Sequence, residues 1–245
     1  MIILFTDFGA DDIYVGQVKA RMLQTAPRGT TIVDLLHCVP DFDPHAGAHL
    51  LAALNGRFPK GAVFFAVIDP GVGGERGAAV LEADGQWFVG PDNGLLSVVA
   101  ARATQTRYWR VRWRPDAMSA SFHGRDLFAP VAADLAGGVL EADWLAPSDG
   151  LDVNFGADDI AQIIYIDHYG NAMTGLRSGT VDRGAAIEAV GRRLEWGRVF
   201  SEVPTGTAFW YENSVGLVEI AVNQGSAAAQ LGLSVGDEVS ILGSA

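Results

Sequence analysis

Two aspartates in the first third of the chain each follow an apolar run that predicts a buried strand. Asp7 comes shortly after residues 2–5, and Asp69 comes directly after residues 63–68. Ligands of open α/β sheets bind outside the carboxyl ends of the strands, so carboxylates there are well placed for chemistry. The alternative is structural, because aspartate near glycine or proline is a common way for a chain to leave a strand. Each acid taken alone leaves both interpretations open.

A third group of chemically capable side chains lies in the segment Phe122-His123-Gly124-Arg125-Asp126. Histidine is the side chain best suited to proton transfer near neutral pH, and glycine permits a close approach of the backbone. The structural alternative is an ion pair between Arg125 and Asp126. His123 by itself does not decide between the two.

Two segments in the second half of the chain lie next to predicted strands. Residues 167–171 are Asp-His-Tyr-Gly-Asn, and residues 210–214 are Trp-Tyr-Glu-Asn-Ser. Acids, amides and aromatic rings together suit a purine nucleoside that carries hydroxyl groups. The same residue types form turns at strand ends, so both interpretations stay open.

A metal site is not expected. His45 and His49 are four residues apart on a predicted helix, with Asp41 and Asp43 nearby, but the glutamate of a zinc-protease motif is missing. The glycine-rich residues 71–77 lack the Lys-Ser/Thr of a phosphate-binding loop. We therefore predict neither a metal nor another cofactor.

Charge and hydropathy narrow the range of partners. The formal net charge of −12 opposes a nucleic-acid partner, since phosphate backbones require a basic surface. The apolar runs have strand length and fall short of the ~20 residues that span a bilayer, so no membrane partner is expected. A single cysteine, Cys38, and an N-terminus without the pattern of a signal peptide favour the cytoplasm.

The elements that must position these residues alternate in the first half of the chain. Residues 2–5, 31–36, 63–68 and 78–81 predict strands, and residues 14–25 and 44–54 predict helices between them. Asp43 and Pro44 form a typical helix start. The pair Asp84-Gly85 predicts a hairpin between residues 78–82 and 87–89. This alternation favours a largely parallel sheet.

The pattern changes after residue 141. Residues 141–159 contain proline, glycine and scattered acids, which is typical of a linker. The short β-like runs 160–166, 186–190, 192–194, 217–221 and 238–242 follow it. The predicted fold class is therefore α/β, with an α/β domain over residues 1–155. A small antiparallel β-barrel over residues 156–245 follows.

Taken together, the motifs resemble the SAM hydroxide adenosyltransferase (SAM hydrolase) family, whose relatives include the bacterial fluorinase and chlorinase. Each motif is weak alone, but their combination and order from Thr6 to about Asn223 are specific. The motifs are Thr6-Asp7-Phe8-Gly9, Asp69-Pro-Gly-Val-Gly with Arg76, Phe122-His-Gly-Arg-Asp126, Asp167 with Gly170-Asn171, and Asn213-Ser214.

The resemblance implies an enzyme that hydrolyses S-adenosyl-L-methionine (SAM) to adenosine and L-methionine. Water or hydroxide attacks the ribose C5′ in a nucleophilic substitution, without a metal or cofactor. It also implies a homotrimer in which SAM lies between the first domain of one subunit and the second domain of its neighbour.

The resemblance also assigns roles to single residues. Asp69, Arg76 and His123 are the catalytic set: Asp69 and His123 activate water, and Arg76 keeps Asp69 ionised. The second domain contributes adenine and methionine contacts. For the nucleoside, the implied contacts are Asp7 with the ribose hydroxyls, Phe42 with the sugar and base, and Asn171 with adenine. Tyr169 and Trp210 are the candidates for stacking on adenine, and the choice among Phe209, Trp210 and Tyr211 stays open. Asp12, Asp167 and Ser214 would hold the methionine end, and Asn213, which precedes Ser214, is also assigned to the substrate site.

Two alternatives belong to other classes. A halide-dependent SAM transferase would form a 5′-halo-5′-deoxyadenosine, and a non-catalytic adenosine- or SAM-binding protein would not need Asp69, Arg76 and His123 together. Two departures from the family pattern also stand out. Gly74-Glu75 precedes Arg76 where small or hydroxylated residues are common, and Val215 follows Ser214 where the fluorinase has arginine.

Overall fold

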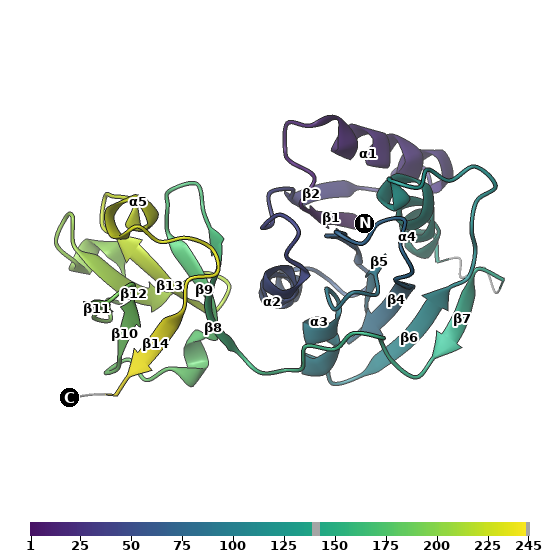
Figure 1. Cartoon of the computed structure of the whole chain (residues 1–245). Coiled ribbons are helices and arrows are strands. Elements are labelled where there is room, and N and C mark those ends of the chain that lie inside the picture. The colour runs from purple at the N-terminus through teal and green to yellow at the C-terminus, as the bar shows by residue number, and fades with distance from the viewer. Residues whose placement is uncertain (139–142, 244–245) are drawn as a thin grey trace. The chain divides into compact units, whose positions relative to one another are not determined.

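A computed structural model describes residues 1–138 and 143–243. The chain divides into two compact units, Met1–Ala157 and Asp158–Ala245 (Figure 1). The predicted division of the substrate contacts between domains 1–155 and 156–245 stays a prediction. None of the helices in the described ranges has the length and apolar character needed to cross a membrane.

The first unit is built on a seven-stranded mixed sheet with the strand order β2-β1-β3-β5-β4-β6-β7. Strands β2, β1, β3 and β5 run parallel, whereas β4, β6 and β7 join them by antiparallel pairing. The strands are β1 (Ile2–Thr6), β2 (Ile32–Leu36), β3 (Val63–Val67), β4 (Ala78–Ala83), β5 (Gln86–Pro91), β6 (Thr106–Val111) and β7 (Leu145–Ser148).

The expectation of a largely parallel sheet is therefore wrong for half of the strand pairs. The predicted hairpin is confirmed: Asp84 and Gly85 both have positive φ, and β4 pairs with β5 antiparallel. This reversal sets the direction of the strands beyond it. The predicted linker also contributes a strand, because β7 pairs with β6; residues 141 and 142 of that linker lie outside the described residues.

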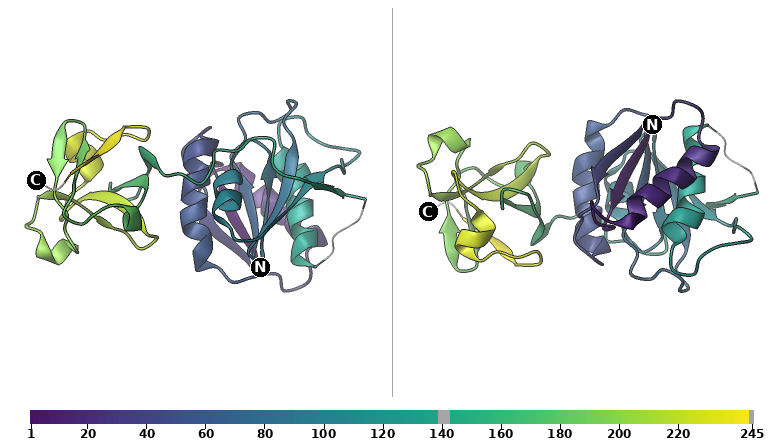
Figure 2. Two further views of the ribbon diagram at one scale, coloured as in Figure 1. Left: turned by 90° about the horizontal axis from the view of Figure 1, so that it is seen from below. Right: turned by 90° about the horizontal axis from the view of Figure 1, so that it is seen from above.

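Helices cover both faces of this sheet (Figure 2). α1 (Ile13–Thr25) packs with α4 (Ala129–Ala136) on one side, and α2 (Pro44–Leu54) packs with α3 (Ser97–Arg102) on the other. β1 is consequently buried along its whole length, with Ile2 and Leu4 in the core cluster that also contains α1 and α4. A strand covered on both faces requires a continuous apolar sequence, which is why β1 and β3 were recognisable.

The order of the strands creates a crevice. The chain passes from β1 to β2 on one side of β1, and then returns to β3 on the other side. In doubly wound sheets such a reversal opens a ligand-binding crevice at the carboxyl ends of the two strands. Asp7 directly follows β1, and Asp69 follows β3 by two residues.

The second unit contains a four-stranded antiparallel sheet, β12-β13-β9-β8, and a three-stranded one, β11-β10-β14. The two sheets share one hydrophobic core, but within the described residues their strands pair only at the isolated bridges Gln162–Glu238 and Trp196–Trp210, so the predicted closed barrel is not formed. Register shifts in β8 interrupt its ladder. The elements are β8 (Ile160–Ile166), β9 (Ala172–Arg177), β10 (Ala186–Ala189), β11 (Arg192–Leu194), β12 (Ala208–Glu212), β13 (Leu217–Val222), α5 (Ala227–Leu231) and β14 (Val239–Leu242).

Candidate active site

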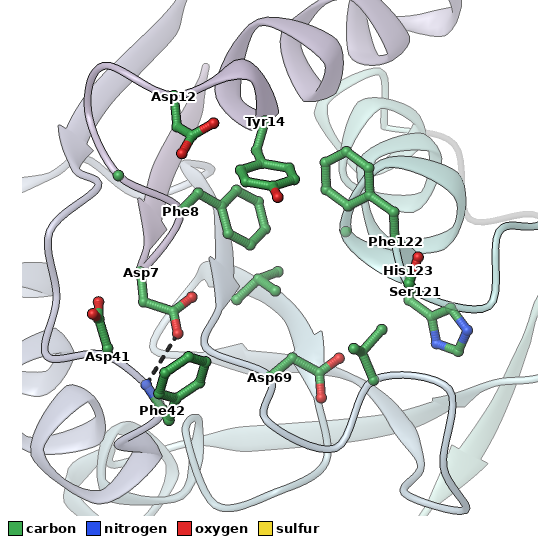
Figure 3. Close-up of a pocket in the computed structure, with 14 residues that line it drawn as sticks. Asp7, Phe8, Asp12, Tyr14, Asp41, Phe42, Asp69, Ser121, Phe122 and His123 are labelled. Atoms are coloured by element: carbon green, nitrogen blue, oxygen red, sulfur yellow. Dashed lines mark hydrogen bonds between the residues drawn. The ribbon is translucent and has the colours of Figure 1, made fainter.

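A pocket of about 460 Å³ lies at the crevice between the carboxyl ends of β1 and β3 (Figure 3). Carboxylates and aromatic rings dominate its lining, and His123 joins them. The carboxylates belong to Asp7, Asp12, Asp41 and Asp69, and the rings to Phe8, Tyr14, Phe42 and Phe122. The strand ends that the sequence singled out therefore meet in one pocket.

Asp7 serves the local turn and faces the pocket at the same time. Its Oδ2 accepts a hydrogen bond from the backbone N–H of Phe42 at 3.2 Å. Phe42 has a φ of +59° and leaves 74% of its side chain surface exposed, so this contact holds an unusual backbone conformation. Burial raises the pKa of the Asp7 carboxyl. Both interpretations of Asp7 from the sequence thus apply to the same side chain.

His37 organises the loop that carries Asp7, and the sequence did not indicate this role. The hydroxyl of Thr6 lies 2.8 Å from Nδ1 of His37, and the His37 carbonyl accepts from the N–H of Gly9 at 2.7 Å. His37 Nε2 lies 3.1 Å from a carboxylate oxygen of Asp34. These contacts connect β1 and β2 on both sides of Asp7.

Asp69, Arg76 and His123 are in direct contact. Arg76 Nε donates to Oδ1 of Asp69 at 2.9 Å, and Arg76 Nη2 donates to Oδ2 of the same carboxylate. Nη2 also lies 3.0 Å from Nδ1 of His123. The side chains of Asp69 and Arg76 leave only 6% and 12% of their surface exposed. The structure therefore brings together three residues that are up to 54 positions apart.

The contact with Arg76 determines which nitrogen of His123 carries the proton. Arginine is always protonated and can only donate, so Nδ1 of His123 must accept and the proton of the neutral ring lies on Nε2. Burial lowers the pKa of His123, and the nearby charge of Arg76 lowers it further. His123 is therefore a neutral ring whose Nε2–H is a donor.

Two loops meet closely to form this group. A Cβ added to Gly73 would lie 2.5 Å from the carbonyl oxygen of Ala120, so only glycine allows the two backbones to approach. Arg125 and Asp126 form the ion pair that the sequence left as an alternative, at 2.7 and 2.9 Å. Asp126 also accepts from the N–H of Ser119 at 2.8 Å, which fixes the loop that leads to His123.

Asp12 has a capping role in addition to its place at the pocket. Its Oδ1 accepts from the N–H of Ile13 at 2.6 Å and so starts α1. The side chain is exposed and lines the same pocket as Asp7 and Asp69 (Figure 3). Helix capping leaves the second carboxylate oxygen, Oδ2, as a further acceptor.

The second unit carries a separate pocket of about 580 Å³, lined in part by Asp167, Tyr169 and Asn171. Asp167 Oδ1 accepts from the backbone N–H groups of Tyr169 and Asn171, both at 2.9 Å. Its Oδ2 accepts from the Asn171 side-chain amide at 3.0 Å. This contact orients the Asn171 amide, with its nitrogen toward Asp167.

Two of the aromatic residues that the sequence offered for stacking, Tyr169 and Tyr211, line this pocket. Trp210 is buried in the core with 1% exposed, and its indole N–H donates to the carbonyl of Ala185. Of the three aromatic residues that the sequence left open, Tyr211 lines this pocket, whereas Phe209 and Trp210 do not. Tyr169 lines the pocket together with Phe200 and Tyr211. Phe200 stands outside any periodic run, so no sequence signal indicated it.

Asn213 and Ser214 lie in the turn between β12 and β13. Asn213 is buried, and its Oδ1 accepts from the N–H groups of Val215 and Leu217, both at 3.0 Å. Ser214 is exposed at this turn. Asn213 therefore shapes the turn, and Ser214 is the member of the motif that is accessible to a ligand.

His45 and His49 lie on one face of α2 with ring centroids 5.2 Å apart, and Phe155 packs on His45 at 4.4 Å. Across residues 1–138 and 143–243, no three metal-binding side chains gather in the geometry of a metal site. The histidine pair thus belongs to an aromatic contact in the first unit.

Comparison with known families decides the relationship. A model described as the SAM hydroxide adenosyltransferase N-terminal domain matches residues 2–144, and one described as the C-terminal domain matches residues 161–240. The chain belongs to the SAM hydroxide adenosyltransferase family. The resemblance inferred from five short motifs is confirmed, and it extends over both units.

Individual relatives of this SAM hydroxide adenosyltransferase family member agree. A protein named (R)-S-adenosyl-L-methionine hydrolase from Thermus thermophilus is 38% identical, over 98% of this chain and 99% of that protein. One of the same name from Salinispora arenicola is 35% identical, over 96% of this chain and 95% of that protein. Fluorinases from Nocardia brasiliensis and an Actinoplanes species are 25% and 27% identical, over 98% of this chain and 96% and 97% of theirs. The crystal structure of an uncharacterized conserved protein from Thermotoga maritima has a TM-score of 0.89 at 31% identity, covering 99% of this chain and 100% of that one.

Proposed function

We propose that this protein is a SAM hydrolase that forms adenosine and L-methionine by substitution at the ribose C5′. The observation that carries the proposal is the contact of Asp69, Arg76 and His123 beside the pocket that contains Asp7. A protein that only binds a nucleoside has no need of this buried group.

The chemistry requires an activated nucleophile more than an acid. The sulfonium of SAM leaves as a neutral thioether, so the leaving group needs no proton. Water is a poor nucleophile at neutral pH and gains from alignment and from partial deprotonation. The active site must therefore hold a water or hydroxide opposite the sulfur.

We assign different roles to Asp69 and His123, and their hydrogen bonds support this assignment. Nε2–H of His123 donates, so His123 orients the nucleophile and stabilises a hydroxide, while Asp69 is the acceptor for the water proton. Each carboxylate oxygen has two acceptor sites, so the bonds from Arg76 leave Asp69 able to accept another. Arg76 contacts both groups and so fixes the position of the Asp69 carboxylate relative to the His123 imidazole. The sequence alone had assigned water activation to Asp69 and His123 jointly.

The charges at the site favour hydrolysis over a halide reaction. Four aspartates line the pocket, so a halide ion that enters it meets their repulsion, whereas water enters as a neutral molecule and is deprotonated only beside Asp69. Arg76 already donates to Asp69, to the carbonyl of Gly77 and to His123. Its charge is therefore directed to partners within the protein. The higher identity to proteins named hydrolases than to fluorinases supports the same choice.

The remaining contacts extend this proposal to the whole substrate. Asp7 accepts from the ribose hydroxyls, with Phe42 against the sugar and base, and Asp12 binds the methionine end. In the second unit, Asn171 binds adenine with Tyr169 stacked on it, and Asp167 and Ser214 bind the methionine end.

Chromatography of the nucleoside formed from SAM by the purified protein tests the function. Adenosine is the expected product, in equal amount to methionine. A 5′-halo-5′-deoxyadenosine that forms with chloride or fluoride would support the halide-dependent transferase instead. Tight binding of SAM without any turnover would support a binding protein.

We expect Asp7→Ala to weaken SAM binding by about 100-fold or more. Two ribose hydroxyls lose a charged acceptor in a partly buried pocket, and each such loss is costly. The backbone of Phe42 also loses the bond that holds its positive φ. Titration calorimetry with SAM measures the effect. An unchanged affinity would assign Asp7 to turn formation alone.

We also propose that the active species is a homotrimer, with the sites completed by a neighbouring subunit. Two exposed aromatic residues support this, since Phe42 and Tyr169 each leave 74% of their surface exposed beside a proposed ligand surface. Light scattering coupled to size-exclusion chromatography should give the mass of three chains. A fully active monomer at assay concentrations would contradict the assembly and leave the hydrolase proposal standing.

A further inference from the structure

A buried glutamate lies on the pocket side of the four-stranded sheet. Glu219 is 2% exposed and pairs directly with Tyr211 across β13 and β12. Its strand neighbours Val218 and Ile220 belong to the hydrophobic core, so the side chain of Glu219 lies on the opposite face. A buried carboxylate is costly unless it is well bonded, so its presence on this face calls for an explanation.

Two side chains donate to this carboxylate, one to each oxygen. The hydroxyl of Tyr211 donates to Oε1, and the amide of Asn213 donates to Oε2 at 2.8 Å. Burial raises the pKa of Glu219, whereas these two hydrogen bonds lower it. Glu219 thus connects the strand β12 with the turn that follows it.

Both partners of Glu219 belong to parts of the second unit that we propose to contact SAM, the pocket and the turn that contains Ser214. The Tyr211 ring lines the pocket and packs edge-on against Phe200, with centroids 5.2 Å apart. The side-chain oxygen of Asn213 accepts hydrogen bonds from backbone N–H groups of the turn that contains Ser214. With the hydroxyl and the amide both engaged by Glu219, the ring and the turn each have one orientation.

We propose that Glu219 is a positioning residue for SAM binding, which sets the Tyr211 ring and the Ser214 turn in their ligand-binding arrangement. This proposal rests on the proposed function for the identity of the ligand. Glu219 is buried beneath the ligand surface, and its two oxygens accept from Tyr211 and Asn213, so it acts on the ligand through these partners. Its loss should therefore change affinity and spare the chemical step.

The two bonds can be removed separately. Tyr211→Phe deletes only the hydroxyl. Glu219→Gln leaves a single acceptor oxygen, so the Tyr211 hydroxyl and the Asn213 amide no longer each donate to an oxygen of their own. We expect each variant to raise the Kd of SAM about tenfold, as for a lost hydrogen bond to a charged group. The kcat should stay within about twofold. The double variant should lose less than the product of the single losses, because both changes act on one network.

Thr174→Val is the matched control. Thr174 is fully buried in the same sheet, and its hydroxyl donates to the carbonyl of Val218 at 2.9 Å, away from the pocket face. We expect it to lower the Tm as the test variants do, without changing the Kd. Test variants that lower the Tm and leave the Kd unchanged would overturn the positioning role. If Glu219→Gln does not fold, Tyr211→Phe alone carries the same comparison.

Direct binding and turnover separate this proposal from the proposed function. Wild-type protein that binds SAM without forming adenosine would overturn the hydrolase function, while the Kd comparison would still decide the role of Glu219. Wild-type protein that forms adenosine, with variants unchanged in Kd, would overturn only the positioning role. Failure of wild-type protein to bind SAM would overturn both.

Discussion

The Asp69→Asn variant should lose turnover of SAM by about 10²–10⁴-fold, the typical cost of removing a general base. An amide is a far weaker proton acceptor than a carboxylate, although it keeps the size and one acceptor oxygen of the original side chain. Arg76 then lacks its charged partner, with only 12% of its side chain exposed. We expect the fold and most of the affinity for SAM to remain, because Asp69 faces the nucleophile.

Single-turnover kinetics in chloride-free buffer measure this loss at the chemical step. Asp152→Asn is the control, since Asp152 pairs with Arg110 at the surface of the same unit and both side chains are largely exposed. Such surface pairs contribute about 0–1 kcal/mol, so this variant should keep the wild-type rate. Wild-type turnover by Asp69→Asn would show that Asp69 does not activate water.

The His123→Ala variant should show a loss of turnover in the same range. It removes the Nε2–H donor and leaves Nη2 of Arg76 without its bond to Nδ1. Combined with Asp69→Asn, the loss should be smaller than the product of the two single losses, because groups that act as a unit are not additive. Losses that multiply cleanly would indicate that the two residues act independently.

A second pair of variants calibrates that test. Asp152→Asn combined with His123→Ala should give a simple product, because Asp152 forms its ion pair with Arg110 and not with Arg76. The pH dependence adds a further check on His123. Burial lowers the pKa of His123, so the neutral form with its Nε2–H donor prevails at pH 7. On acidification Nδ1 takes up a proton and no longer accepts from Arg76, so the turnover rate of the wild type should fall. His123→Ala should lack this acid limb.

Part of the fold was predictable because local sequence determines it. Helix α2 begins where Asp43 caps it and Pro44 occupies its first turn, and the structure has the same bounds, Pro44–Leu54. Strands β1 and β3 are covered on both faces and so have continuous apolar sequences. β9 was not predicted, because Gly175 and Thr174 interrupt its pattern.

For the site, the sequence determined that Asp7 and Asp69 each follow a predicted strand, and the order of the motifs indicated the family. The tertiary structure decided that these two strands are neighbours. Only the tertiary structure decided that Arg76 donates to both Asp69 and His123, and hence which nitrogen of the imidazole is the donor. It also decided that Trp210 is buried while Tyr211 faces the pocket. The physical reason is that caps, turns and apolar periodicity depend on near neighbours in the chain, whereas hydrogen-bond partners and burial depend on strand pairing between distant segments.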